Sequence, residues 1–204
     1  TGQKEMPWVG TFHGVAAWIL RAEKHPYEKF VIYDEADQLS LVKEVLKEHN
    51  LAGENFRPAF IKELLSKAKN ELTDEQSYTK LARAAFEKEV VSLVYQSYQK
   101  KLEDNRALDF DDLLFEVLKL FQQKSKVLEK YQERFRYLLV DEYQDTNIAQ
   151  YQFINKLAQK YKNLCVVGDV DQAIYGWRGA DFRNILNFEK DYPEARIFKL
   201  EENY

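Results

Sequence analysis

The sequence predicts an α/β protein in which a parallel sheet with flanking helices is interrupted by an all-helical segment. After about residue 136, short apolar runs typical of strands alternate with helical patterns, which indicates parallel strands joined by helices. Between residues 56 and 105 the β-branched runs disappear and amphipathic helical patterns of mixed charge replace them. Only 7 Gly and 4 Pro occur in 204 residues, so we expect long elements and short loops.

Residues 1–55 are expected to form the first part of the α/β domain. Residues 8–12 (WVGTF) alternate like a strand, and a helical pattern follows them. Residues 30–34 (FVIYD) predict a second strand. Asp37 is then expected to cap the next helix, because a short acidic side chain can accept hydrogen bonds from a free helix N-terminus.

The segment from residue 56 to residue 105 is expected to be a helical subdomain inserted into the α/β domain. Its basic residues are interleaved with Glu, which is more typical of a solvated face than of a DNA groove, although contact with duplex DNA stays open. These basic residues are Lys62, Lys67, Lys69, Lys80, Arg83 and Lys88.

Residues 106–204 are expected to complete the α/β domain. Residues 108–123 predict a helix whose first turn carries Asp109, Asp111 and Asp112. Helix capping explains these acids without any further function. The strands predicted in this part are residues 137–141, 164–169 and 196–200.

Composition excludes several classes of protein. The single Cys165 excludes a disulfide framework, and no His has partners at metal-ligand spacing, so we expect no zinc site. No apolar run is long enough to span a membrane and no signal peptide is visible, which favours a cytoplasmic location without membrane partners. With a net charge of -4, any nucleic-acid binding must use a local patch.

Acidic side chains directly follow the predicted strand in YLLVDEYQDTN (137–147). Ligands of open parallel sheets bind beyond the carboxyl ends of the strands. Asp141 at this position suits a hydrated Mg²⁺, and Glu142 can orient or deprotonate a water for in-line attack on a phosphoryl group. The alternative is a helix cap with solvated acids, which is the commoner situation for an isolated Asp-Glu pair.

A second predicted strand end leads to Gln172, whose amide can both donate and accept hydrogen bonds. Beside the two acids it could detect a terminal phosphate; alone it would be a loop residue. Tyr175, Trp177 and Arg178 follow, and an indole with a neighbouring guanidinium can stack on bases and pair with phosphate. The alternative is an aromatic core plug with a surface Arg. His13, after the first predicted strand, could touch a ligand at the same sheet edge.

In this order and spacing, VDEYQDTN (140–147), VVGDVDQAIYGWRGAD (166–181) and LEENY (200–204) resemble motifs II, III and the start of motif IV of superfamily 1 helicases of the UvrD/PcrA/Rep group. GTFHG (10–14) resembles the TFHS motif of that family, with Gly where Ser is usual, and LDFDDLL (108–114) matches another of its signatures.

The resemblance implies a partial RecA-like parallel sheet, which is a P-loop NTPase domain without its N-terminal P-loop part. Residues 1–55 and 106–204 would form domain 1A, and residues 56–105 would form the inserted helical subdomain 1B. The implied activity is that of an ATP-dependent 3′-to-5′ DNA helicase and translocase in repair or replication. Its implied partners are Mg²⁺, ATP, single-stranded DNA, single-to-double-strand junctions and other repair or replication proteins.

The resemblance also implies roles for individual residues. Asp141 would bind Mg²⁺, with Glu142 beside the metal as the catalytic base. Gln172 would contact the γ-phosphate of ATP, and Tyr204 would stack on adenine. The residues implied to line the DNA path are Thr11, Phe12, His13, Tyr175, Trp177 and Arg178.

The 204 residues also depart from the family pattern. They contain no G-x-x-x-x-G-K-[ST] sequence, and Glu202 stands where Gln is common. We therefore expect the chain to be a piece of a longer bacterial, nucleoid-associated protein, and by itself to neither hydrolyse ATP nor unwind DNA. Two alternatives stay open: a helicase-nuclease subunit of the RecB or AddA type, for which the helical segment is short, and a DNA-binding module without a motor.

Overall fold

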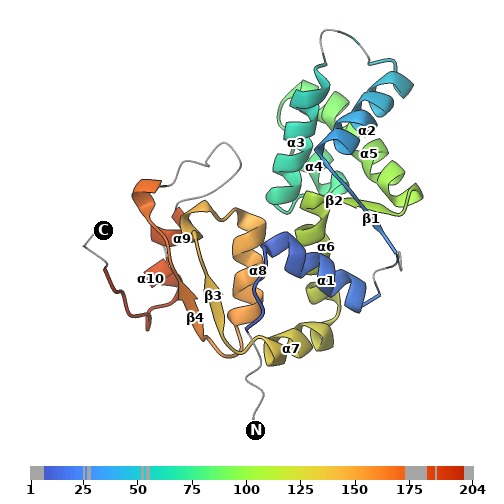
Figure 1. The fold of residues 1–204 in the computed structure, drawn as a ribbon. Coiled ribbons are helices and arrows are strands. Elements are labelled where there is room, and N and C mark those ends of the chain that lie inside the picture. The colour runs from blue at the N-terminus through green and yellow to red at the C-terminus, as the bar shows by residue number, and fades with distance from the viewer. Residues whose placement is uncertain are drawn as a thin grey trace.

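The structure is a computed structural model, which describes residues 7–24, 26, 29–51, 53, 56–172, 183–186 and 188–199. Within them the chain is mostly helical, with short parallel strands, as Figure 1 shows. In this described part, no helix combines the length and the apolar character needed to cross a bilayer.

In chain order, the helices and strands are α1 (Phe12–Ala22), β1 (Val31–Tyr33), α2 (Glu35–Glu48), α3 (Pro58–Asn70), α4 (Glu75–Leu81), the π-helical η1 (Glu87–Val91), α5 (Ser92–Asp104), β2 (Ala107–Asp109), α6 (Phe110–Gln123), α7 (Ser125–Arg134), β3 (Leu138–Val140), the 3₁₀-helical η2 (Tyr143–Asp145), α8 (Ile148–Ala158), β4 (Leu164–Val166), the 3₁₀-helical η3 (Val170–Gln172), α9 (Arg183–Leu186) and α10 (Phe188–Asp191).

The described strands form two separate pairs. β1 pairs with β2, with Val31 opposite Ala107, and β3 pairs with β4, with Val140 opposite Val166. Both pairs are parallel and each is linked through helices, so the predicted mixed α/β class with parallel strands is confirmed. Among the described residues the pairs do not join into the single sheet that the sequence predicted.

Two predicted strands are wrong within the described residues. Residues 8–12 form no strand, because the side chain of Thr11 caps α1 and Phe12 already begins that helix. The ring of Trp8 packs instead against Trp18 and Phe135, with centroid distances of 4.7 and 5.4 Å. Residues 196–199 have no strand partner in the described chain, and a strand exists only through hydrogen bonds to a neighbour.

The capping residue of α2 also differs from the prediction. Asp34 is the N-cap, and its Oδ1 accepts hydrogen bonds from the backbone N–H groups of Ala36 and Asp37 at 2.8 and 2.9 Å. Asp37 Oδ2 accepts a hydrogen bond from Asp34 N at 3.2 Å, which completes a capping box. Acids therefore occupy both positions of the box, and the sequence pattern pointed to the second of them.

The helical lobe of the molecule has its own apolar core. It gathers side chains from α2, α3, η1, α5 and β2. In Figure 1 the helices α2, α3 and α5 lie together, away from β3 and β4. The helix α2 thus packs with the helical segment although it precedes residue 56; the domain limits at 55 and 105 stay a prediction. The buried residues of this core are Leu41, Val42, Val45, Leu46, Ile61, Leu65, Ala68, Val91, Val94, Tyr95, Tyr98, Leu102 and Ala107.

A second core joins α1, α6, α7 and α8, and a small third core lies behind β3. The small core is formed by Val140, Tyr143 and Ile154, and Phe12 packs against both. The start of α1 is therefore held against the strand end that carries the acidic motif.

A buried ion network joins α3 to the first turn of α6. Lys69 Nζ lies 2.6 Å from Asp109 Oδ2 and 2.8 Å from Asp112 Oδ1, and all three side chains are 1–3% exposed. We call these three residues the Lys69 network. The predicted capping by Asp109 and Asp112 is confirmed by a capping box at α6, whereas the solvated position expected for Lys69 is wrong. Its ammonium group can be buried because Asp109 supplies the opposite charge and Asp112 supplies a second oxygen contact in place of water.

Beside the Lys69 network, a second set of hydrogen bonds reaches toward the acidic motif. Asn70 Nδ2 donates a hydrogen bond to Asp111 Oδ1 at 2.9 Å. Asn147 Nδ2, in turn, donates to Asn70 Oδ1 at 2.5 Å. Because Asn147 is the N-cap of α8, the helical lobe is hydrogen bonded to the residue that ends VDEYQDTN.

The free energy of unfolding is expected to contain a term from Asp112 that decreases between about pH 4 and pH 7. Burial and the charge of Asp109 raise the pKa of Asp112 to about 7. A carboxyl group whose pKa is raised in the folded state favours folding below its unfolded pKa, and this contribution is lost as the pH rises through the folded pKa. The pKa of Asp109 is lowered, so the titration of Asp109 changes the free energy of unfolding only at pH values below this range.

The variant Asp112→Asn, whose side chain has no proton to lose, should flatten this part of the pH dependence. The measurement is urea unfolding of the wild type and the variant at several pH values between 4 and 8. Equal slopes for the two proteins would contradict the assignment.

Candidate functional site

The structure brings the two predicted strand ends together. The parallel pairing of Val140 with Val166 sets the end of β3 beside the end of β4. Val167 N donates a hydrogen bond to Val140 O at 2.8 Å, and Tyr143 N donates to Val167 O at 2.9 Å. The segment after β3 therefore folds back over the segment after β4, and their polar side chains share one edge.

Glu142 has an unusual backbone conformation at this edge. Its φ of 50° and ψ of 43° lie in the left-handed region, which costs a residue with a side chain on the order of 1 kcal/mol or more. Asp141 Oδ1 accepts a hydrogen bond from Glu142 N at 3.0 Å and so supports the turn. Asp141 and Glu142 are both exposed, so their carboxylates are open to a ligand.

Gln144 connects the two strand ends from below the surface. Its Nε2 donates a hydrogen bond to Glu142 Oε2 at 2.6 Å, and its Oε1 accepts one from Asp169 N at 3.0 Å. The residue is 1% exposed. Gln144 was not predicted from the sequence; the available signal was an amide side chain two positions after the candidate base.

Gly168 makes this close approach possible. A Cβ atom at this position would lie 2.5 Å from Gln144 Oε1 and 2.9 Å from Ile185 Cδ1, both too near for a side chain. Glycine is therefore required here for space, because the amide of Gln144 occupies the volume of the missing methyl group.

Gln172 lies on the same edge, in η3. Its Nε2 donates a hydrogen bond to Asp169 Oδ2 at 2.8 Å, and Asp171 N donates to Asp169 Oδ1 at 3.0 Å. Glu142 and Gln172 are thus linked through Gln144 and Asp169. We call Asp141, Glu142, Asp169 and Gln172 the acidic edge.

The acidic edge fits a Mg²⁺ ion held mainly by water and phosphate. Its carboxylates are exposed, hard oxygen donors, and Mg²⁺ usually takes one or two of them while keeping several waters. Within the described ranges, no group of three or more His, Cys, Asp or Glu side chains forms a metal cage by itself. Asp141 and Glu142 are the residues that would face such an ion.

Two buried polar atoms of η2 have no hydrogen-bond partner among the described residues. They are the hydroxyl of Tyr143 and Oδ1 of Asp145. Burial, followed by the charge of Glu142, raises the pKa of Asp145. A proton on Asp145 would reduce the charge repulsion in this short acidic stretch.

The GTFHG segment meets the start of α6. Thr11 Oγ1 accepts a hydrogen bond from Gly14 N at 3.1 Å, and Phe12 is partly buried against the cores. The ring of His13 lies 5.7 Å from that of Phe110 in an edge-to-face contact, and burial lowers the pKa of His13, which keeps its imidazole neutral at pH 7. Phe110 is 46% exposed and was missed, because the sequence pattern showed only a capped helix start.

Four predicted site residues lie outside the described residues. They are Tyr175, Trp177 and Arg178 after η3, and Tyr204 at the end of the chain. The structure brings together Asp141, Glu142 and Gln172 on the acidic edge, and Thr11, Phe12 and His13 at the start of α1.

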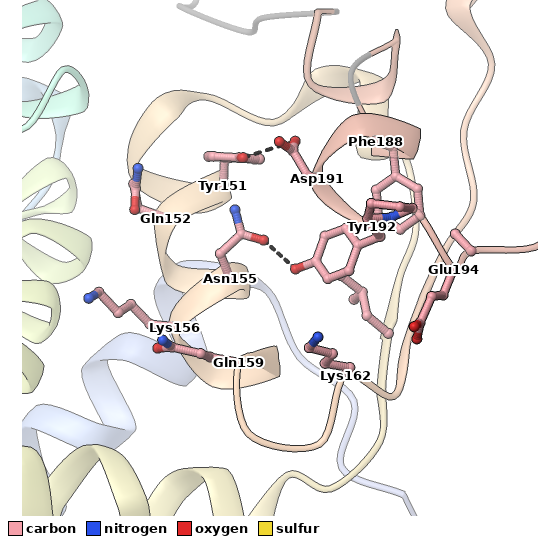
Figure 2. Close-up of a pocket in the computed structure, with 13 residues that line it drawn as sticks. Tyr151, Gln152, Asn155, Lys156, Gln159, Lys162, Phe188, Asp191, Tyr192 and Glu194 are labelled. Atoms are coloured by element: carbon pink, nitrogen blue, oxygen red, sulfur yellow. Dashed lines mark hydrogen bonds between the residues drawn. The ribbon is translucent and has the colours of Figure 1, made fainter.

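A separate cavity of about 750 Å³ lies between α8 and the segment from α10 to residue 195. Figure 2 shows Tyr151 hydrogen bonded to Asp191 and Asn155 hydrogen bonded to Tyr192 along this cavity. None of the residues predicted to carry chemistry lines it, so we place the candidate site at the acidic edge.

Comparison with known proteins identifies the family. Residues 1–193 match the UvrD/REP helicase N-terminal domain. The chain is 52% identical over 200 residues to the ATP-dependent DNA helicase PcrA of Bacillus subtilis, which covers 97% of the chain and 27% of that relative. It is 49% identical over 205 residues to the PcrA protein of Staphylococcus aureus, which covers 99% of the chain and 28% of that relative.

The chain therefore spans little more than a quarter of the length of these relatives. The match to the family nevertheless extends over nearly all of the 204 residues and includes the whole acidic edge. The chain belongs to the UvrD/REP helicase family, and it corresponds to part of the N-terminal domain of that family.

Proposed function

We propose that the full-length protein is an ATP-dependent DNA helicase and 3′-to-5′ translocase, with ATP bound at the acidic edge of a RecA-like domain. The observation that carries this proposal is the hydrogen-bonded link from Glu142 through Gln144 and Asp169 to Gln172. The names of the relatives, ATP-dependent DNA helicase PcrA, support the same reaction. The proposed setting is repair or replication in the bacterial cytoplasm, at the nucleoid.

Three residues of the acidic edge have distinct tasks in this proposal. Asp141 holds the hydrated Mg²⁺ that neutralises charge on the phosphates. Glu142 orients the attacking water and accepts its proton, because its carboxylate is exposed and fixed at one oxygen by Gln144. Gln172 contacts the γ-phosphate in this proposal, and loss of its hydrogen bond to Asp169 would couple that contact to the loop.

The proposed path of single-stranded DNA runs past the start of α1. Thr11 and the exposed ring of Phe110, beside His13, offer polar and stacking contacts there. Tyr175, Trp177 and Arg178 are proposed to add a stacking platform and a phosphate contact. The helical lobe is proposed as subdomain 1B, which would face duplex DNA at a single-to-double-strand junction, where other repair or replication proteins would meet it.

The test is ATP turnover by the full-length protein with and without single-stranded DNA. We expect DNA to stimulate phosphate release, and we expect the double variant Trp177→Ala, Arg178→Ala to lose at least tenfold in affinity for single-stranded DNA, since base stacking contributes about 1–3 kcal/mol per base. Unchanged DNA affinity in the double variant would overturn the stacking role.

The absence of ATP turnover in the full-length protein would contradict the proposed motor activity and would favour a DNA-binding module. We further propose that the 204 residues alone do not turn over ATP, because no phosphate-cradling G-x-x-x-x-G-K-[ST] loop occurs in them. Turnover by the isolated chain would contradict this part of the proposal.

A further inference from the structure

We propose that Gln144 is a positioning residue, which fixes the carboxylate of Glu142 relative to the loop that carries Gln172. This inference rests on the proposed ATPase function. Gln144 itself is 1% exposed and so lies beneath the acidic edge, where it acts on substrate only through its neighbours. Its two hydrogen bonds, at 2.6 Å to Glu142 and at 3.0 Å from Asp169, use both ends of one amide group.

The chemistry of an amide explains why glutamine suits this position. The site needs a donor toward the carboxylate of Glu142 and an acceptor toward the backbone N–H of Asp169. Glutamine supplies both from one planar group, whereas glutamate keeps the acceptor but sets a second carboxylate oxygen against Glu142. Methionine fills a similar volume and supplies neither bond.

The surroundings of Gln144 leave it little freedom to move. Thr146 Oγ1 donates a hydrogen bond to Tyr143 O at 2.8 Å and closes the turn that carries it. Asn184 Nδ2 donates to Thr146 O at 3.0 Å, which ties α9 to the same turn. The amide oxygen of Gln144 also packs closely against the backbone of Gly168. Gln144 is therefore held between Glu142 and Asp169 by contacts on several sides.

This arrangement predicts a selective defect in catalysis. Loss of the donor to Glu142 lets its carboxylate leave the position in which it receives a proton, and misplacement of a catalytic group costs about 10-fold to 100-fold in rate. Nucleotide binding does not need this hydrogen bond. The expected signature is a lower kcat with an almost unchanged KM for ATP.

The experiment uses the full-length protein with the variants Gln144→Met and Gln144→Glu. The matched control is Gln132→Met, because Gln132 is also buried, at 6% exposure, and its Nε2 donates to Lys156 O at 2.7 Å between α7 and α8. We expect both variants of Gln144 to lose about 10-fold to 100-fold in DNA-stimulated kcat while Gln132→Met keeps it. A near-normal kcat in Gln144→Glu would show that only the bond to Asp169 matters and would overturn the inference.

A double-mutant cycle separates positioning from a purely structural role. If Gln144 acts through Glu142, then Gln144→Met should have little further effect on the residual turnover of Glu142→Gln. The inference would be overturned if Gln144→Met lowered turnover by the same factor in the Glu142→Gln variant as in the otherwise wild-type protein. If Glu142→Gln itself leaves turnover intact, the proposed function fails. If Glu142→Gln loses turnover but Gln144→Met keeps its kcat, as Gln132→Met does, only the positioning role fails.

Discussion

The replacement of Glu142 by Gln is expected to lower DNA-stimulated ATP turnover by about 100-fold to 10,000-fold, which is the range for loss of a general base. The amide has nearly the size of the carboxylate, and its oxygen can still accept the hydrogen bond from Gln144 Nε2. What it cannot do is accept the proton of the attacking water. The measurement is steady-state phosphate release by the full-length protein with saturating single-stranded DNA.

The control for this prediction is Glu129→Gln. Glu129 is exposed on α7, away from the acidic edge, so the same chemical change there should leave turnover unaltered. ATP binding by Glu142→Gln, measured separately, should persist because Asp141 keeps the carboxylate that is proposed to hold Mg²⁺. If Glu142→Gln kept turnover within tenfold of the wild type, Glu142 would not be the base.

The replacement of Lys69 by Met is expected to lower the free energy of unfolding by about 3–5 kcal/mol, which is typical of breaking a buried ion pair from one side. Met fills the volume of the lysine stem, so the change removes mainly the charge. Asp109 and Asp112 would then lie buried, 1–3% exposed, without the ammonium group that is 2.6 and 2.8 Å from them. Urea unfolding at constant pH measures the loss.

The matched control for Lys69 is Lys67→Met on the same helix. The side chain of Lys67 is 69% exposed, and its nearest carboxylate oxygen, on Glu71, is 4.0 Å away. An exposed pair of this kind contributes less than about 1 kcal/mol. A loss in Lys69→Met no larger than in Lys67→Met would show that the buried charges contribute nothing net to stability.

The features that could be predicted from the sequence are the ones that a short stretch determines. The apolar run before Asp141 and the run before Gly168 indicated β3 and β4, because both patterns lie within a few residues. The helical character of α3 and α5 followed from amphipathic spacing in the same way. Asp141, Glu142 and Gln172 were identified because acids and amides at strand ends are local signals.

The features that could not be predicted depend on contacts between distant segments. Lys69 looked solvated beside its Glu neighbours, because the acids that bury it lie 40 or more residues further along the chain. The role of Gln144 could not be predicted because its partner Asp169 follows β4, which lies next to β3 only in the folded chain. Trp8 looked like part of a strand, and only the fold shows the aromatic rings that hold it.

The Lys69 network has a practical consequence for protein engineering. Lys69 belongs to the helical lobe, but Asp109 ends β2 and caps α6, and Asp112 lies in the first turn of α6. A chimaera that transplanted residues 35–105 into another scaffold would carry an ammonium group in its apolar interior and leave the neutralising carboxylates behind. Such a graft needs to include residues 107–112, so the natural exchange unit is longer than the helical segment itself.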